Sequence, residues 1–126
     1  MRYLLDTTLL IDHANGLPTA VEMVASLFEE PNDLYTCDIV TAEVLSGGTD
    51  EQRRVIGSML DVLEYVATSP EAARSAGESR RQRGADGRRG IGDALIVAVA
   101  RQIGAVIVTR NPRDFECQGA VVRLYA

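Results

Sequence analysis

The stretch that decides the fold is IGDALIVAVARQIG at positions 91–104, followed at once by AVIVT at 105–109. The first part is apolar almost all round, which indicates a buried helix, and Gly104 is the residue type that commonly ends a helix. The second part is an apolar run of strand length. A buried helix that leads directly into a buried strand is typical of an α/β protein with a mainly parallel sheet.

The same alternation extends toward both ends of the chain. Strands are expected at 2–6, 34–37, 64–67, 105–109 and 121–125, and helices at 7–15, 18–30, 39–45, 49–63, from 69 onward and at 91–104. Residues 110–115 are expected to form a turn, and the polar, Gly-rich residues 77–90 are expected to fray into a mobile basic connection. The pattern therefore predicts a three-layer α/β/α fold, with a single domain spanning 1–126.

Composition narrows the possible classes of protein. With 126 residues, 46% apolar and 25% charged, the chain fits one globular domain. Its longest apolar run, 94–100, is far shorter than the roughly 18 residues of a membrane span, so we expect no membrane segment and a cytoplasmic protein. Cys37 and Cys117 are isolated, which favours reduced, structural thiols over a disulfide framework or a zinc site.

Lysine is absent, since all 13 basic residues are Arg. This excludes the Walker A phosphate loop and Schiff-base catalysis, because both need an ammonium group. The formal net charge of −5 means that a nucleic acid would have to bind a local basic patch rather than the protein as a whole.

Four acidic residues are expected at one edge of the sheet. Asp6 ends the first expected strand, and Glu43 lies near the start of the helix that follows the second strand. Asp93 is in the first turn of the buried helix, and Asp114 follows the strand that ends at Thr109. In a parallel α/β sheet, strand carboxyl ends and helix N-termini share the edge where ligands bind. The fold is therefore expected to bring these four segments together.

Carboxylates gathered in a partly desolvated cleft repel one another unless a cation lies between them. An all-oxygen ligand set favours Mg²⁺ or Mn²⁺ over zinc. The chemistry that follows most directly is hydrolysis of a phosphodiester by water activated at the metal.

Each acid also has an ordinary structural explanation. Asp6 could cap the following helix, Glu43 could be a solvated surface residue, Asp93 could complement the helix dipole, and Asp114 could belong to a turn with Asn111. Thr7 and Thr8 could likewise be helix caps, although Thr8 and Asn111 are also candidates for supporting polar residues. No convergent role emerges for Asp12. The prediction rests on convergence and not on any single residue.

Arginines cluster immediately before the helix that carries Asp93, with six of the thirteen between positions 74 and 89. This cluster could be a solvated helix face or could contact a phosphate backbone. The candidates for RNA binding, including two arginines at the last acidic site, are Arg80, Arg81, Arg83, Arg88, Arg89, Arg110 and Arg113.

Four segments in order resemble the PIN-domain ribonucleases, specifically VapC-type toxins of bacterial toxin–antitoxin pairs: LLDTTLLID, TAEVLSG, GDALIVAVA and VTRNPRDF. The resemblance implies a Mg²⁺- or Mn²⁺-dependent endoribonuclease that uses Asp6, Glu43, Asp93 and Asp114 as its catalytic, metal-binding acids. It also implies a homodimer and a VapB-like antitoxin that blocks the site, in a heterotetramer or larger assembly. Thr8 stands where many members carry Ser or Asn.

Other classes of protein compete with this interpretation. A signalling receiver domain shares the fold class and an acidic Mg²⁺ pocket, and haloacid-dehalogenase-like phosphatases share an early acidic strand motif, but both use a lysine that this chain lacks. A PIN-like binding module without nuclease activity is the third alternative.

Overall fold

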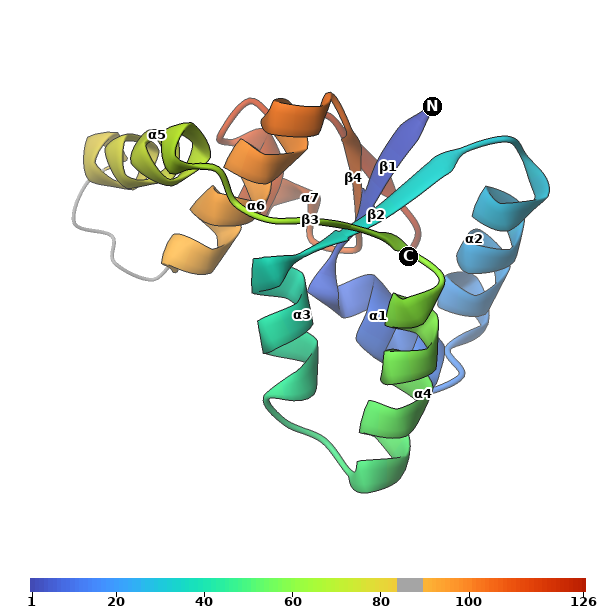
Figure 1. Ribbon diagram of the computed structural model, residues 1–126. Coiled ribbons are helices and arrows are strands. Elements are labelled where there is room, and N and C mark those ends of the chain that lie inside the picture. The colour runs from blue at the N-terminus through green and yellow to red at the C-terminus, as the bar shows by residue number, and fades with distance from the viewer. Residues whose placement is uncertain (84–89) are drawn as a thin grey trace.

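The computed structural model describes residues 1–83 and 90–126 and has the expected α/β architecture (Figure 1). Five strands form one sheet in the order β3-β2-β1-β4-β5, and every neighbouring pair is parallel. The strands are β1 (Arg2–Leu5), β2 (Asp33–Cys37), β3 (Glu64–Val66), β4 (Val106–Thr109) and β5 (Val122–Leu124).

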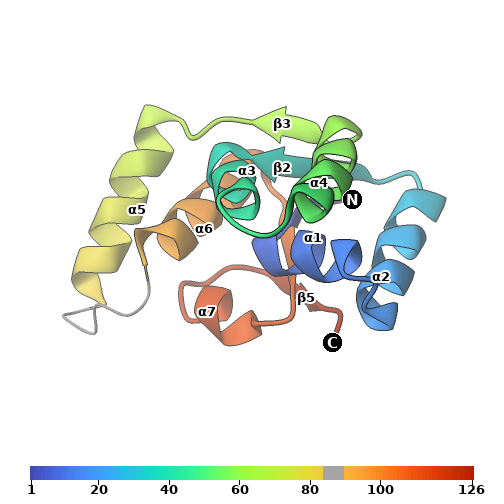
Figure 2. The ribbon, with the colours of Figure 1, turned by 90° about the horizontal axis from the view of Figure 1, so that it is seen from below.

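Helices cover both sides of this sheet, which gives three layers (Figures 1 and 2). The seven helices of the described residues are α1 (Thr7–Ala14), α2 (Pro18–Glu29), α3 (Asp38–Leu45), α4 (Asp50–Asp61), α5 (Pro70–Gln82), α6 (Ile91–Ile103) and α7 (Pro112–Glu116). None of them has the length and apolar character needed to cross a membrane.

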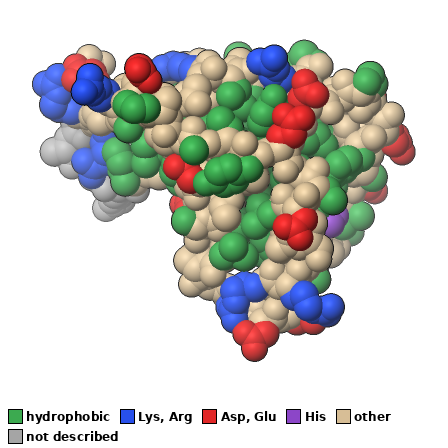
Figure 3. Space-filling model, in the orientation of Figure 1, with side chains coloured by type: hydrophobic (Ala, Val, Ile, Leu, Met, Phe, Trp, Pro, Cys, Tyr) green, Lys and Arg blue, Asp and Glu red, His purple; other side chains and the backbone are tan. Residues whose placement is uncertain are grey.

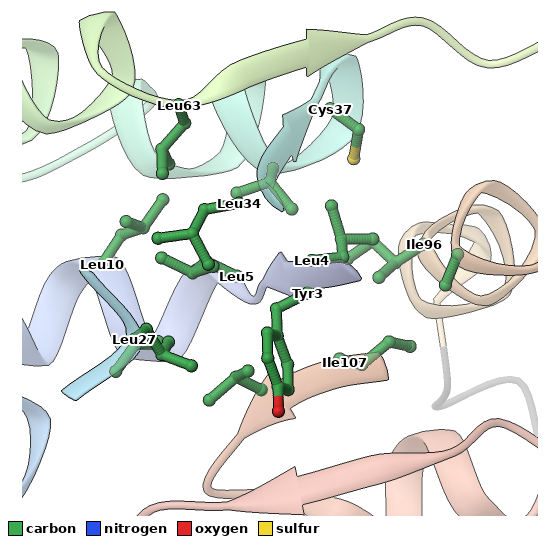
Figure 4. Close-up of a cluster of buried hydrophobic side chains, with 14 of the residues drawn as sticks. Tyr3, Leu4, Leu5, Leu10, Leu27, Leu34, Cys37, Leu63, Ile96 and Ile107 are labelled. Atoms are coloured by element: carbon green, nitrogen blue, oxygen red, sulfur yellow. The ribbon is translucent and has the colours of Figure 1, made fainter. Parts of the chain in front are cut away.

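The core forms around the central strand β1. Leu4 and Leu5 are fully buried. Because successive strand residues point to opposite faces of the sheet, they pack against the helices on opposite sides of it. Figure 4 shows Leu4 on the side of Ile96, from α6, and Leu5 on the side of Leu10, from α1. The strand therefore holds the two helical layers together and fixes where its last residue points.

Helix α6 matches the expectation from its sequence. Six of its residues are buried, and it ends at Gly104, whose φ of 65° lies in the left-handed region that favours glycine. The backbone amide of Ala105 then bonds the carbonyl of Ala100 at 2.8 Å and directs the chain into β4. This tight junction makes the direction of α6, and hence the position of its first turn, a consequence of local sequence.

Two expectations about irregular segments are wrong. Residues 77–82 belong to α5 and do not fray, because Ala72 and Ala76 pack with Ala94 and Ala98 of α6, and exposed Glu78 pairs with Arg81 one turn on. The rest of the expected connection, 84–89, lies outside the described residues. The expected turn at 110–115 contains α7, whose first position is a proline that suits a helix start.

Candidate functional site

Asp6 follows β1 directly, and its side chain is buried at the edge where the parallel strands end. Its Oδ2 accepts hydrogen bonds from the hydroxyls of Thr109, at 2.8 Å, and Thr8, at 3.0 Å. Although Asp6 occupies the N-cap position of α1, its side chain makes no cap hydrogen bond. The backbone amides of Thr7 and Thr8 nevertheless face this carboxylate and help to lower its pKa, and the Thr8 hydroxyl contacts it directly.

Burial raises the pKa of Asp6 above its ordinary value, and the hydrogen bonds from Thr109 and Thr8 lower it again only in part. Among residues 1–83 and 90–126, no arginine or histidine forms an ion pair with this carboxylate. A desolvated carboxylate that lacks a protein cation is costly in its charged form. A bound cation at this point would relieve that cost.

Glu43 lies in α3, the helix expected to carry it, and is exposed. Its Oε1 accepts a hydrogen bond from Thr7 at 2.9 Å. Its other carboxylate oxygen lies against Gly92 of α6, where an added Cβ would be only 3.3 Å from Oε2. The carboxylate of Glu43 is thus the point at which α1, α3 and α6 meet, and Thr7 is used for this contact and not as a cap.

Asp93 follows Gly92 in the first turn of α6 and is half-buried. Asp114 lies in the first turn of α7 and is also half-buried. The start of α7 is tied to the Asp6 site, because the amide of Asn111 donates to the same Thr109 hydroxyl, at 3.0 Å. Viewed from the edge where the strands end, α1, α3, α6 and α7 surround one region (Figure 2).

Within the described part of the chain, no three or more Asp, Glu, His or Cys side chains form a group that could hold a metal ion. Each of the four acids lies on or next to an element that begins or ends at this edge, but no three of their side chains form a shared ligand group among the described residues. The edge offers carboxylate and hydroxyl oxygens. Among residues 1–83 and 90–126 no cation pairs with the buried Asp6 carboxylate, and the missing side chain at Gly92 leaves room for the carboxylate of Glu43. This donor set fits a hard divalent cation of the kind that keeps several waters.

The arginines expected to bind RNA lie in different places. Arg80 and Arg81 are exposed at the end of α5, where Figure 3 shows positive side chains gathered, and Arg83 is half-buried beside Cys117. Arg110 and Arg113 are exposed at the start of α7. The remaining two candidates, Arg88 and Arg89, lie outside the described residues.

Sequence reasoning missed two features of this edge. Thr109 holds both Asp6 and the start of α7, and its only signal was its place at the end of an apolar strand. Asp12, for which no role was found, is buried and contacts Arg110 and Tyr125. Nothing in the sequence links these three residues, because the contacts span 98 and 113 positions.

Comparison with known proteins gives consistent matches. Residues 3–117 match the family model described as PIN domain. The chain is 30% identical to ribonuclease VapC19 of Mycobacterium tuberculosis over 115 residues, which cover 89% of this chain and 90% of that protein. It is 32% identical to ribonuclease VapC11 of the same organism, covering 98% and 96%. The solved structure of VapBC2 from Rickettsia felis, bound to a promoter DNA fragment, superposes over the whole of both chains with a TM-score of 0.82 at 23% identity.

Proposed function

Because the chain belongs to the PIN domain family, we propose that it is a ribonuclease and the toxin of a VapBC-type toxin–antitoxin pair. The observation that carries this proposal is the similarity to VapC ribonucleases at 30–32% identity over about nine-tenths or more of both chains. The signalling-receiver alternative has no support in these matches. A PIN-like module without activity is an outcome of the experiment described below.

The proposal extends to the cofactor, Mg²⁺ or Mn²⁺. Asp6, Glu43, Asp93 and Asp114 are the residues that would hold it. The support is the oxygen-only donor set and the buried Asp6 carboxylate, whose charge no described cation balances. When bound, such an ion supplies activation of water and neutralises charge that develops on a phosphodiester during endonucleolytic cleavage.

The chain's own residues have separate tasks in this scheme. The hydroxyls of Thr8 and Thr109 hold Oδ2 of Asp6, so that its carboxylate keeps one orientation while desolvated. The Thr7 hydroxyl donates to Oε1 of the exposed Glu43 carboxylate, and Gly92 lets that carboxylate approach the start of α6. Preorganised oxygens of this kind need little rearrangement when the substrate binds, which is how a fixed site lowers a barrier.

RNA is expected to approach along exposed arginines on two sides of this edge. Arg80 and Arg81 end α5, and Arg110 and Arg113 flank the start of α7. Nη2 of Arg81 lies 2.5 Å from Oε1 of Glu78, but an exposed ion pair of this kind is weak, so a phosphate can replace the Glu78 carboxylate. Phosphate contacts position the strand without reading its sequence.

A cleavage assay tests the catalytic proposal. Purified protein is incubated with a fluorescently labelled RNA in Mg²⁺, Mn²⁺ or excess EDTA, and D6N is compared with D61N, which removes a charge from an exposed residue at the end of α4. We expect cleavage by the wild-type protein and D61N only with metal, and none by D6N. Cleavage that persists in EDTA would exclude the metal, and a folded protein without cleavage in any metal would support the inactive module.

The partner proposal is a VapB-like antitoxin together with a homodimer of this chain. Its support is the full-length structural likeness to a toxin that was solved with its antitoxin. Expression of this chain alone is expected to arrest growth of a bacterial host, and co-expression of a neighbouring small reading frame is expected to relieve the arrest. Equal growth of cells that express wild type or D6N without that frame would contradict the toxin assignment.

A further inference from the structure

The carboxylate of Asp12 is the centre of a buried network next to the candidate active site. Its Oδ2 accepts a hydrogen bond from the phenol of Tyr125 at 2.7 Å and lies 3.1 Å from Nη1 of Arg110. These residues come from α1, the segment after β5 and the segment after β4. Three chain segments therefore converge on one carboxylate oxygen.

This network is continuous with the residues that hold Asp6. The Thr8 hydroxyl, which bonds Asp6, also lies beside the phenol of Tyr125. Arg110 directly follows Thr109, the second hydroxyl donor to Asp6. The Asp12 network therefore reaches the residues that hold Asp6 through Tyr125 and Thr8, and Arg110 is the chain neighbour of Thr109.

The two partners of the ion pair differ in exposure. The Asp12 side chain is 10% exposed, whereas that of Arg110 is 48% exposed. A guanidinium carries five N–H donors in a planar fork, and the atom pair that joins it to Asp12 involves Nη1, so the exposed part of the group can still offer donors to a phosphate. Tyr125 strengthens the anchor, since burial and the bond to Asp12 raise the pKa of its phenol and keep it a donor.

We propose, on the basis of the ribonuclease function proposed above, that Arg110 binds a phosphate of the RNA substrate beside Asp6, and that Asp12 and Tyr125 are positioning residues that hold its guanidinium there. Arginine suits this task because it can be anchored at one nitrogen and bind an anion with the others. A lysine would lose one of the two contacts.

Positioning of Arg110 and a general electrostatic effect predict opposite results for D12N. D12N removes a negative charge near the RNA path, so the field alone would make RNA bind more tightly. Loss of positioning has the opposite sign, because the arginine is no longer held at the phosphate. The direction of the D12N effect therefore tests the proposal.

The experiment measures two quantities on a short labelled RNA: the dissociation constant against salt in EDTA, and kcat/KM in Mn²⁺. The variants are D12N, Y125F, R110A, R110K and the double variant D12N/R110A. E51Q and R54A are matched controls, because Glu51 and Arg54 form an ion pair with both side chains exposed on α4. Circular dichroism and thermal unfolding identify variants that fail to fold. If D12N fails to fold, Y125F still tests whether the Asp12 network positions Arg110.

We expect R110A to weaken binding at least tenfold and to reduce the salt slope by about one phosphate contact. D12N should lower kcat/KM at least tenfold and Y125F about threefold, with no gain in RNA affinity. R110K should keep the salt slope without restoring kcat/KM. In the R110A background D12N should change kcat/KM less than twofold, because Asp12 then has nothing to position. The controls should match the wild type.

The proposal is overturned if D12N cleaves like the wild type or binds RNA more tightly, or if D12N lowers kcat/KM equally with and without Arg110. If the wild type cleaves, D6N does not, and R110A and D12N match the wild type, only this proposal fails. If the wild type neither binds nor cleaves RNA, the ribonuclease function fails and this proposal fails with it.

Discussion

Substitution of Gly92 by alanine should make the protein more stable and less active. Gly92 is the second residue of α6, where alanine is favoured over glycine by up to about 1 kcal/mol, and a value near 0.5 kcal/mol is expected in a first turn. The new Cβ would lie 3.3 Å from Oε2 of Glu43, so this oxygen must move by a few tenths of an ångström. Glu43 is exposed and flexible, and its displacement therefore costs little stability.

The activity responds differently, because the same displacement changes the hydrogen bond from Thr7 and the approach of Glu43 to α6. Since a misplacement of about 1 Å can cost on the order of a hundredfold in rate, a shift of a few tenths should cost roughly three- to tenfold in kcat/KM. The matched control is G57A in α4, where an added Cβ meets nothing within 4 Å.

Thermal unfolding and cleavage of a labelled RNA together check this reasoning. Both variants should unfold about 2 °C higher than the wild type, and only G92A should lose activity. Full activity of G92A would mean that the place of Glu43 beside α6 does not matter for catalysis. A loss of more than about 1 kcal/mol in unfolding free energy would mean that the contact is not relieved by the Glu43 side chain.

Four further predictions concern the same edge and the two thiols. D6N should raise the melting temperature at pH 7–8 and abolish cleavage. Because burial raises the pKa of Asp6, the wild type gains stability as the pH falls through that pKa. Melting curves at several pH values should therefore show that the stability advantage of D6N over the wild type shrinks in acid. T109V should lower the unfolding free energy in urea by about 1–3 kcal/mol, since the buried hydroxyl both donates to Asp6 and accepts from the amide of Asn111. Mn²⁺ should raise the melting temperature of the wild type. At a metal concentration a hundredfold above the dissociation constant, the gain in unfolding free energy should be about 2.7 kcal/mol. This shift should be absent in D6N and reversed by EDTA. Iodoacetamide at pH 8 should alkylate exposed Cys117 in the folded protein and reach Cys37 only after unfolding, because Cys37 is buried and this burial raises its pKa to about 11. Equal labelling of the two cysteines in the folded protein, measured by mass spectrometry, would contradict the burial of Cys37.

The fold was predictable because its decisive signals are local. The apolar run of α6, the glycine that ends it and the apolar strand after it need no distant partner to be recognised. The capping box of Thr49 and Gln52 is another local signal, and both of its hydrogen bonds are present. Where the prediction failed, at the end of α5, the helix is held by alanines that pack against α6, which a reading of residues 77–82 alone does not include.

The candidate acids could be proposed for a similar reason. Each follows a strand or lies in the helix after one, so the rule for parallel sheets predicts all four at one edge. The contacts that organise that edge were not predictable. Thr7 and Glu43 are 36 positions apart, and the buried bond between Asp12 and Tyr125 spans 113. Such pairs depend on the register between elements, and sequence periodicity carries no information about it.

Two departures from ordinary stability rules occur at this edge. A carboxylate is buried without a described cation at Asp6, and a glycine occupies the first turn of an otherwise strongly apolar helix. Each one lowers stability when considered alone, and each has a simple substitution that would avoid the cost. Proteins break such local rules more often at functional sites, and Gly92 adjoins the carboxylate of Glu43. A cation-dependent site at this edge predicts that D6N and G92A both increase stability while they remove or reduce activity, and this test does not depend on sequence similarity.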